Sequence, residues 1–128
     1  MRFSRTLAFV LGALAPLLET VRRWGEWWDD PPAYLDDWLL GAALIAGVWA
    51  AGRSERGVRM LAAAWGLACG MGWYSCFGQL HCLRAGEPDP APIASEAVLA
   101  IKVAGTLLAA VALVVTVRAR HADAPPAA

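Results

Sequence analysis

The chain has 128 residues, of which 59% are hydrophobic and 17% are charged, and its formal net charge is zero. A soluble domain is usually about 45–50% apolar and ~25% charged, so this composition favours a membrane protein. Without a positive excess there is no electrostatic support for a nucleic-acid partner. The length predicts one domain.

Charged residues divide the sequence into apolar segments that predict helices. A bilayer core requires about 20 helical residues per span. The predicted spans cover about 5–21, 32–52, 58–80 and 96–117. We therefore expect an all-α fold, an integral membrane bundle of four transmembrane helices in one domain over residues 1–119. Residues 120–128 are predicted to form a disordered tail.

The first segment is the shortest, because its uncharged run covers only Thr6–Leu18. Arg2 and Arg5 precede it, and a basic start before a short apolar core is also typical of a signal peptide. Pro16 directly after a small-residue triplet argues against cleavage there. We predict a spanning helix over residues 3–21, with an interfacial helix and only three spans as the alternative.

The second segment begins with paired carboxylates. Asp30 is suited to the N-cap of a helix, and Pro31 then occupies the first helical position, where its missing N–H costs nothing. Asp36 and Asp37 fall in the second turn, near the positive end of the helix dipole. We expect the pair Asp29 and Asp30 to mark the helix start, and we predict no metal site, because these oxygens do not converge.

Basic residues are distributed unevenly between the loops. A four-span arrangement places Arg84 and two others on one side, and seven arginines on the opposite side: Arg2, Arg5, Arg53, Arg56, Arg59, Arg118 and Arg120. The positive-inside rule then predicts that both termini are cytoplasmic. The usage of Ala, Arg, Gly and Trp suggests a GC-rich bacterial genome, and we therefore expect the membrane to be a bacterial inner membrane.

Lys102 lies inside the last apolar segment, roughly 10 Å along the helix from its start. An ionisable group at that depth usually faces a partner. The predicted partners are Asp36 and Asp37, with Glu19 at the outer end of the first segment. The alternative is that the lysine stem extends to the interface and leaves its ammonium in water.

Small residues predict where helices approach closely, since lipid offers no hydrophobic driving force between helices. Gly66 and Gly70 are four residues apart in the third segment, and Ala42 and Ala46 repeat that spacing in the second. We expect both pairs to act in helix packing.

Cysteine and tryptophan mark the outer end of the predicted bundle. Cys76 and Cys82 are able to form a disulfide in an oxidising compartment if the helix breaks near Gly78. An unbroken helix would point them to different faces. The connection after the first span contains Trp24, Trp27 and Trp28, which we interpret as interface anchors.

No nucleophile–base pair, phosphate-binding loop, zinc spacing or haem-ligand pair is evident, so we expect no enzyme, no cofactor and no metal. The favoured function is an accessory or structural membrane subunit that associates with other membrane helices, either of a partner protein or of further copies. A small oligomeric transporter or channel is the first alternative. A thiol redox membrane protein that uses Cys76 and Cys82 is the second.

Overall fold

The computed structural model describes residues 1–22, 24, 31–87 and 93–122. Four helices account for almost all of them: α1 (Arg2–Arg22), α2 (Pro31–Ala51), α3 (Glu55–Ala85) and α4 (Ser95–Ala122). The described residues include no strand. The expected all-α fold with four helices is confirmed.

Most helix boundaries lie close to the predicted ones. α2 begins at Pro31, as the proline position indicates, while the expected N-cap Asp30 and its neighbour Asp29 lie outside the described residues. α3 is longer than predicted, with 31 residues. α4 continues to Ala122, so the start of the predicted disordered tail is helical, and residues 123–128 lie outside the described part.

The ends of α3 explain its length. Ser54 has an extended backbone, and its side chain accepts a hydrogen bond from the Gly57 amide at 3.1 Å, which satisfies a helix-start donor. At the other end Gly86 adopts a left-handed φ of 70°. The Gly86 amide donates to the Leu83 carbonyl and the Glu87 amide donates to the Cys82 carbonyl, which completes a Schellman motif.

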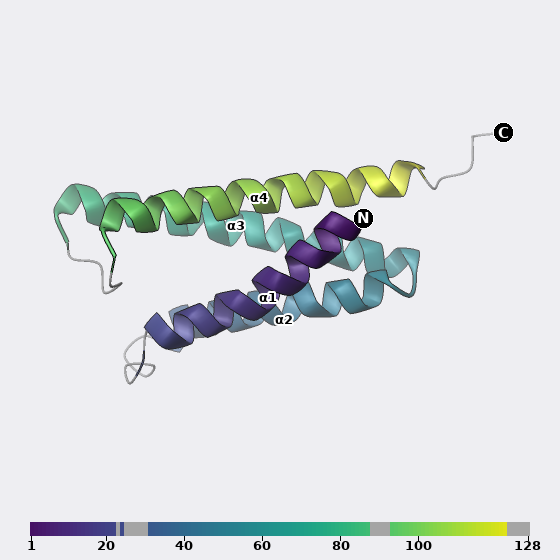
Figure 1. The fold of residues 1–128 in the computed structure, drawn as a ribbon, viewed down its shortest axis with the longest axis horizontal. Helices are drawn as coiled ribbons and strands as arrows, with labels where there is room; N and C mark the ends of the chain where they lie inside the picture. Colours follow the sequence, from purple (N-terminus) through teal and green to yellow (C-terminus); the bar gives the residue numbers. More distant parts are fainter. Residues whose placement is uncertain (23, 25–30, 88–92, 123–128) are drawn as a thin grey trace.

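The helices run up and down as two pairs that converge at one end (Figure 1). The pair α1 and α2 meets the pair α3 and α4 near the N-terminus of α1, and the two pairs separate toward the opposite end. α3 is central, since it packs extensively on both α2 and α4, whereas α1 contacts α4 only weakly.

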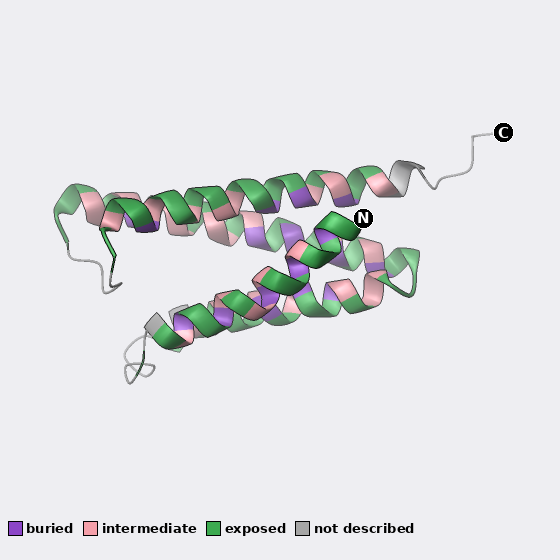
Figure 2. Ribbon diagram, viewed as in Figure 1, coloured by how far each residue is buried: buried purple, intermediate pink, exposed green. Residues whose placement is uncertain are grey.

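Buried residues gather where the pairs converge (Figure 2). The core consists of apolar side chains from all four helices: Ala8, Leu44, Leu61, Ala64, Trp65, Ala68, Ala109 and Ala112. Most members are alanine, which lets the helix backbones approach closely. The convergent end is therefore the part that fixes the fold.

Three of the helices are long and apolar enough to cross a membrane, over Arg2–Val21, Tyr34–Ala51 and Ser95–Ala119. α3 is not among them, although a span over residues 58–80 was expected. It is long enough, but its apolar segment is interrupted by glycines and by Trp, Tyr, Ser and Gln side chains. Membrane location is thus indicated by three helices, and α3 requires a separate explanation.

Candidate functional site

One side of α3 is exposed along the length of the helix. Its exposed residues follow alternating steps of three and four: Ala63, Gly66, Gly70, Trp73 and Phe77. We call these five residues the α3 seam. Steps of three and four keep side chains on one helix face and are the spacing by which a helix packs against a second helix. Leu67 and Tyr74 border the seam and are also exposed.

The two glycines of the seam have open space in front of them. Apart from the backbone of α3 itself, a Cβ atom added to Gly66 or to Gly70 would meet no atom of the described residues within 4 Å. These glycines therefore do not make the contacts between helices of this chain that the four-residue spacing predicted. Ala42 and Ala46 are likewise exposed on α2.

Aromatic side chains form the other half of the seam. The rings of Trp73 and Phe77 meet edge to face, with centroids 5.0 Å apart, and both remain more than half exposed. Tyr74 beside them is 82% exposed. The contact holds the two rings of the seam in a defined arrangement, and this face is both shaped and uncovered.

The opposite side of α3 packs against α4. Gly72 lies directly against the side chain of Thr106, and a side chain larger than hydrogen would collide there. The Thr106 hydroxyl donates to the Lys102 carbonyl at 2.8 Å, so the Cys76 thiol is the donor in its 3.6 Å contact with Thr106. Polar groups on this interface are thus paired with one another.

Lys102 contacts a residue that was not among its predicted partners. Its ammonium donates to Oε1 of Gln79, a buried side chain of α3, at 2.9 Å. Lys102 lies on the pair α3 and α4, whereas the predicted carboxylates lie on the other pair, which diverges from it at this end (Figure 1).

Gln79 was missed in the sequence because it closes an apolar segment and carries no charge. The available signal was a single amide side chain at the end of an apolar segment. A buried amide requires a hydrogen-bond partner, so Gln79 could have been considered as a partner for Lys102. The seam was missed too, since only its glycine pair was recognised. The aromatic positions at the same alternating spacing were the remaining signal.

A second polar cluster lies in the core at the convergent end. Trp65 donates its indole N–H to the Ser4 hydroxyl at 2.8 Å, and the Ser4 and Thr116 hydroxyl oxygens are 2.6 Å apart. Thr116 donates to the Ala112 carbonyl, so the Ser4 hydrogen must point to Thr116. All three side chains are fully buried, and every donor has an acceptor.

These two polar clusters are separated along α4. Thr106 and Thr116 are ten positions apart, or roughly 15 Å of helix, and the buried residues between them on α4 are Ala109 and Ala112. Within the described residues no group of three His, Cys, Asp or Glu side chains is placed to hold a metal ion.

The cysteines do not form the disulfide considered above. Cys69, Cys76 and Cys82 are all free. α3 continues without a break through Gly78, so Cys76 and Cys82 remain six residues apart on an intact helix and point to different faces. The interpretation as a disulfide pair is wrong for this conformation.

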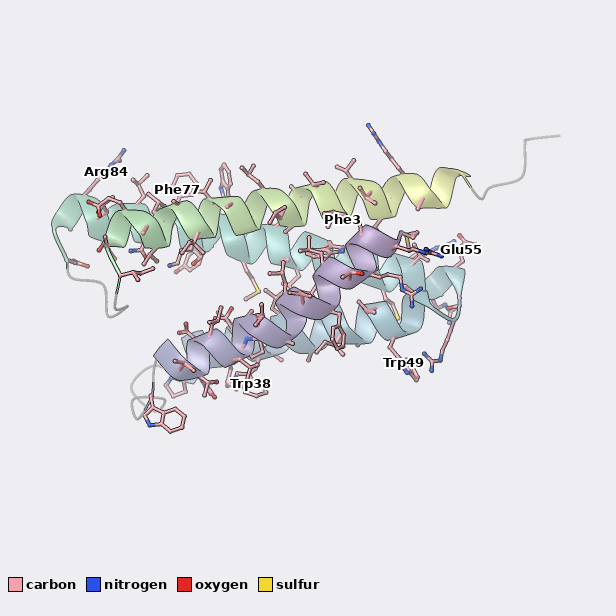
Figure 3. All side chains as sticks on the ribbon, viewed as in Figure 1. Phe3, Trp38, Trp49, Glu55, Phe77 and Arg84 are labelled. Atoms are coloured by element: carbon pink, nitrogen blue, oxygen red, sulfur yellow. The ribbon has the colours of Figure 1, made fainter. Side chains whose placement is uncertain are left out.

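Two further predicted residues, Glu19 and Trp24, lie at the C-terminal end of α1 or just after it. Glu19 is buried, at 8% exposure, on the side of α1 that packs in the bundle. Trp24 is 74% exposed, as an interface anchor would be, whereas Trp27 and Trp28 lie outside the described residues. Arg84 lies toward one end of the long axis and Glu55 toward the other, whereas Phe77 and Trp38 lie along the bundle (Figure 3).

Comparison of the chain with protein-family models, with curated proteins and with solved structures gives no match. Function must therefore be argued from the arrangement itself: an exposed, shaped seam on the central helix of a bundle in which the other three helices are apolar enough to cross a membrane.

Proposed function

We propose that this protein is a structural membrane protein that spans the bilayer four times and associates with other membrane helices through the α3 seam. The observation that carries the proposal is the exposed face of α3. Small and aromatic residues lie on it at the spacing of a helix-packing surface.

Contact with lipid stabilises this face less than contact with another helix would. Lipid chains are as apolar as leucine, so membrane helices gain most from one another where small residues allow close approach and extended van der Waals contact. Gly66 and Gly70 offer this close approach, and no side chain in the described part of the chain fills the space before them. A second helix would cover the glycines and also pack on Trp73 and Phe77.

The occupant that fits best is a second copy of this chain. A glycine pair is self-complementary, because two identical helices can cross at the same Gly66–Gly70 position about a twofold axis. The same residues then contact each other in both copies. A helix of a different protein is the alternative occupant, and the experiment below separates the two.

The proposed orientation follows from the arginines. Arg2, Arg5, Arg53 and Arg118 lie at the convergent end of the bundle, together with Arg56 and Arg59. The positive-inside rule places that end in the cytoplasm, and in a bacterial inner membrane both termini would be cytoplasmic. The seam then extends through the membrane toward the opposite surface.

The test compares Gly66→Leu and Gly70→Leu with Gly105→Leu in mild detergent by native mass spectrometry. All three positions have open space, so each variant should keep its helical circular dichroism. We expect wild type and Gly105→Leu to form dimers, and both seam variants to be monomers. Co-purification of another membrane protein, lost in the seam variants only, would identify a hetero-complex instead. Equal association of all four proteins would contradict the proposed seam.

No specific observation favours the two alternatives. A transporter requires polar groups that continue across the membrane, and the two described polar clusters are separated by buried alanines. A thiol redox protein requires paired cysteines, and the three cysteines are free.

A further inference from the structure

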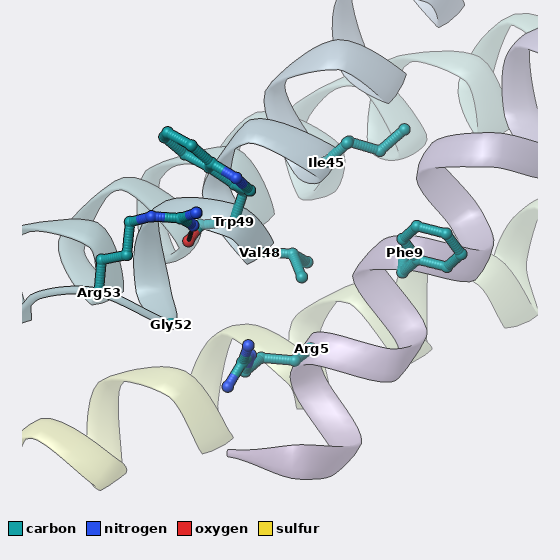
Figure 4. A pocket seen from close by; sticks show the side chains of 7 residues that line it. All are labelled: Arg5, Phe9, Ile45, Val48, Trp49, Gly52 and Arg53. Atoms are coloured by element: carbon teal, nitrogen blue, oxygen red, sulfur yellow. Dashed lines mark hydrogen bonds between the residues drawn. The ribbon is translucent and has the colours of Figure 1, made fainter.

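A groove opens at the convergent end, between the start of α1 and the end of α2 (Figure 4). It has a volume of about 580 Å³ and two chemically distinct parts. Arg5 from α1 and Arg53 after α2 line one part of it, which we call the mouth, and Gly52 lies next to both arginines. Phe9, Ile45 and Val48 line the part that extends along the helices.

The two arginines are held in place by neighbours that do not neutralise them. The Arg53 guanidinium lies 3.5 Å from the ring centroid of Trp49 and donates to the Trp49 carbonyl at 2.8 Å. The Arg5 guanidinium lies against Gly52, where an added Cβ would be 3.0 Å from Nη2. Within the described residues neither Arg5 nor Arg53 forms an ion pair.

The surroundings of the groove are also positive. Arg2, Arg56 and Arg118 are exposed at the same end of the bundle. The described carboxylate closest in sequence to the groove, Glu55, forms an ion pair with Arg59 at 3.0 Å. A ligand that enters the mouth therefore gains most if it is an anion.

We infer that this groove binds an anionic phospholipid, with the phosphate between Arg5 and Arg53 and one acyl chain along Phe9, Ile45 and Val48. A free phosphate would use only the mouth and would leave the apolar wall uncovered. A lipid matches both parts, because its charged group and its chain are joined at the level of the membrane surface. The inference rests on the membrane placement in the proposed function, but not on the seam.

The test is lipid retention measured by native mass spectrometry, with phosphatidylglycerol and phosphatidylcholine added in equal amounts. We expect wild type to retain more phosphatidylglycerol than phosphatidylcholine. In the double variant Arg5→Gln/Arg53→Gln, the ratio of the two retained lipids should fall by about tenfold. Arg118→Gln removes one charge at the same end but outside the groove, and should retain the preference. Inorganic phosphate at millimolar concentration should not compete.

A second variant tests the inference even if the double arginine variant does not fold. Gly52→Leu keeps both charges and has no positive φ to strain it, but its side chain would displace the Arg5 guanidinium. We expect it to lower phosphatidylglycerol retention while helical circular dichroism is unchanged.

Three results would overturn the inference: equal retention of both lipids by wild type, an equal loss in Arg118→Gln, or displacement of the lipid by phosphate. Failure of the proposed function is a different result. It would appear as release of the protein from membranes by alkaline carbonate, or as unchanged association of the seam variants.

Discussion

The indole N–H of Trp65 donates a hydrogen bond to the hydroxyl of Ser4 at 2.8 Å, although the two residues are 61 positions apart. The bond joins α3 to the start of α1, and it continues through Ser4 to Thr116 on α4. Three helices thus share one buried hydrogen-bond chain. This chain lies beside the alanine-rich core and helps to explain why the helix pairs converge at this end.

Ser4→Ala should destabilise the bundle by about 1–3 kcal/mol, because it leaves the buried indole donor of Trp65 without its acceptor. The measurement is the free energy of unfolding in mixed micelles titrated with a denaturing detergent. Ser75→Ala on the same helix as Trp65 is the control, since Ser75 has no described side-chain hydrogen bond. A loss in Ser4→Ala no larger than in this control would contradict a structural role for the chain.

Gly41→Ala should destabilise the packing of α1 on α2 by about 1–3 kcal/mol through overpacking. A Cβ at Gly41 would lie 2.5 Å from the backbone carbonyl oxygen of Gly12, which cannot rotate away. Gly105→Ala is the control, because a Cβ there meets nothing within 4 Å. The control should gain up to ~1 kcal/mol from the helix propensity of alanine. Similar effects at both positions would show that the crossing tolerates expansion.

Lys102 and Gln79 should be energetically coupled. A double-mutant cycle with Lys102→Met and Gln79→Leu should give a coupling free energy of about 1–3 kcal/mol, as expected for a partly buried hydrogen bond from a charged donor. The matched cycle of Lys102→Met with Asp36→Asn should give a value near zero. Strong coupling to Asp36 and none to Gln79 would restore the ion pair that the sequence suggested.

The thiol of Cys82 should ionise less readily than an ordinary cysteine. A hydrogen bond with Glu87 raises its pKa, and partial burial and the negative charge of Glu87 act in the same direction. Removing that charge in Glu87→Gln should lower the pKa, so alkylation at a fixed pH below it should become faster.

The alkylation rate is measured against pH in a Cys69→Ala/Cys76→Ala background, so that Cys82 is the only thiol. Glu96→Gln removes an exposed carboxylate from the first turn of α4 and serves as the control. An unchanged pH profile in Glu87→Gln would show that Glu87 does not govern this thiol.

All four helices of the bundle were predictable from the sequence. Charged residues bound each apolar segment, Pro31 marks a helix start that the structure confirms, and α4 begins within one residue of the predicted start at 96. These features are local: hydrophobic length, caps and prolines act within one or two helical turns. Local signals were enough to place the elements, although they did not show how far α3 and α4 extend.

Tertiary structure decided which residues meet. From the sequence, Lys102 was paired with carboxylates at a similar depth on other helices. The depth of a residue does not show which way its helix is rotated, nor how far apart the two helix pairs lie. The divergence of the two pairs places Gln79, and not Asp36, beside Lys102. The same rotation turns Gly66 and Gly70 outward and places Gly41 and Gly72 at the close contacts.

The sequence by itself therefore determined the helical class, the apolar character of the helical segments and the uneven arginines. Only the tertiary structure decided which small residues are covered, which leaves the α3 seam exposed and brings Arg5 and Arg53 to one groove. The physical reason is that helix formation depends on nearby residues, whereas packing depends on how helices from distant parts of the chain are rotated against one another.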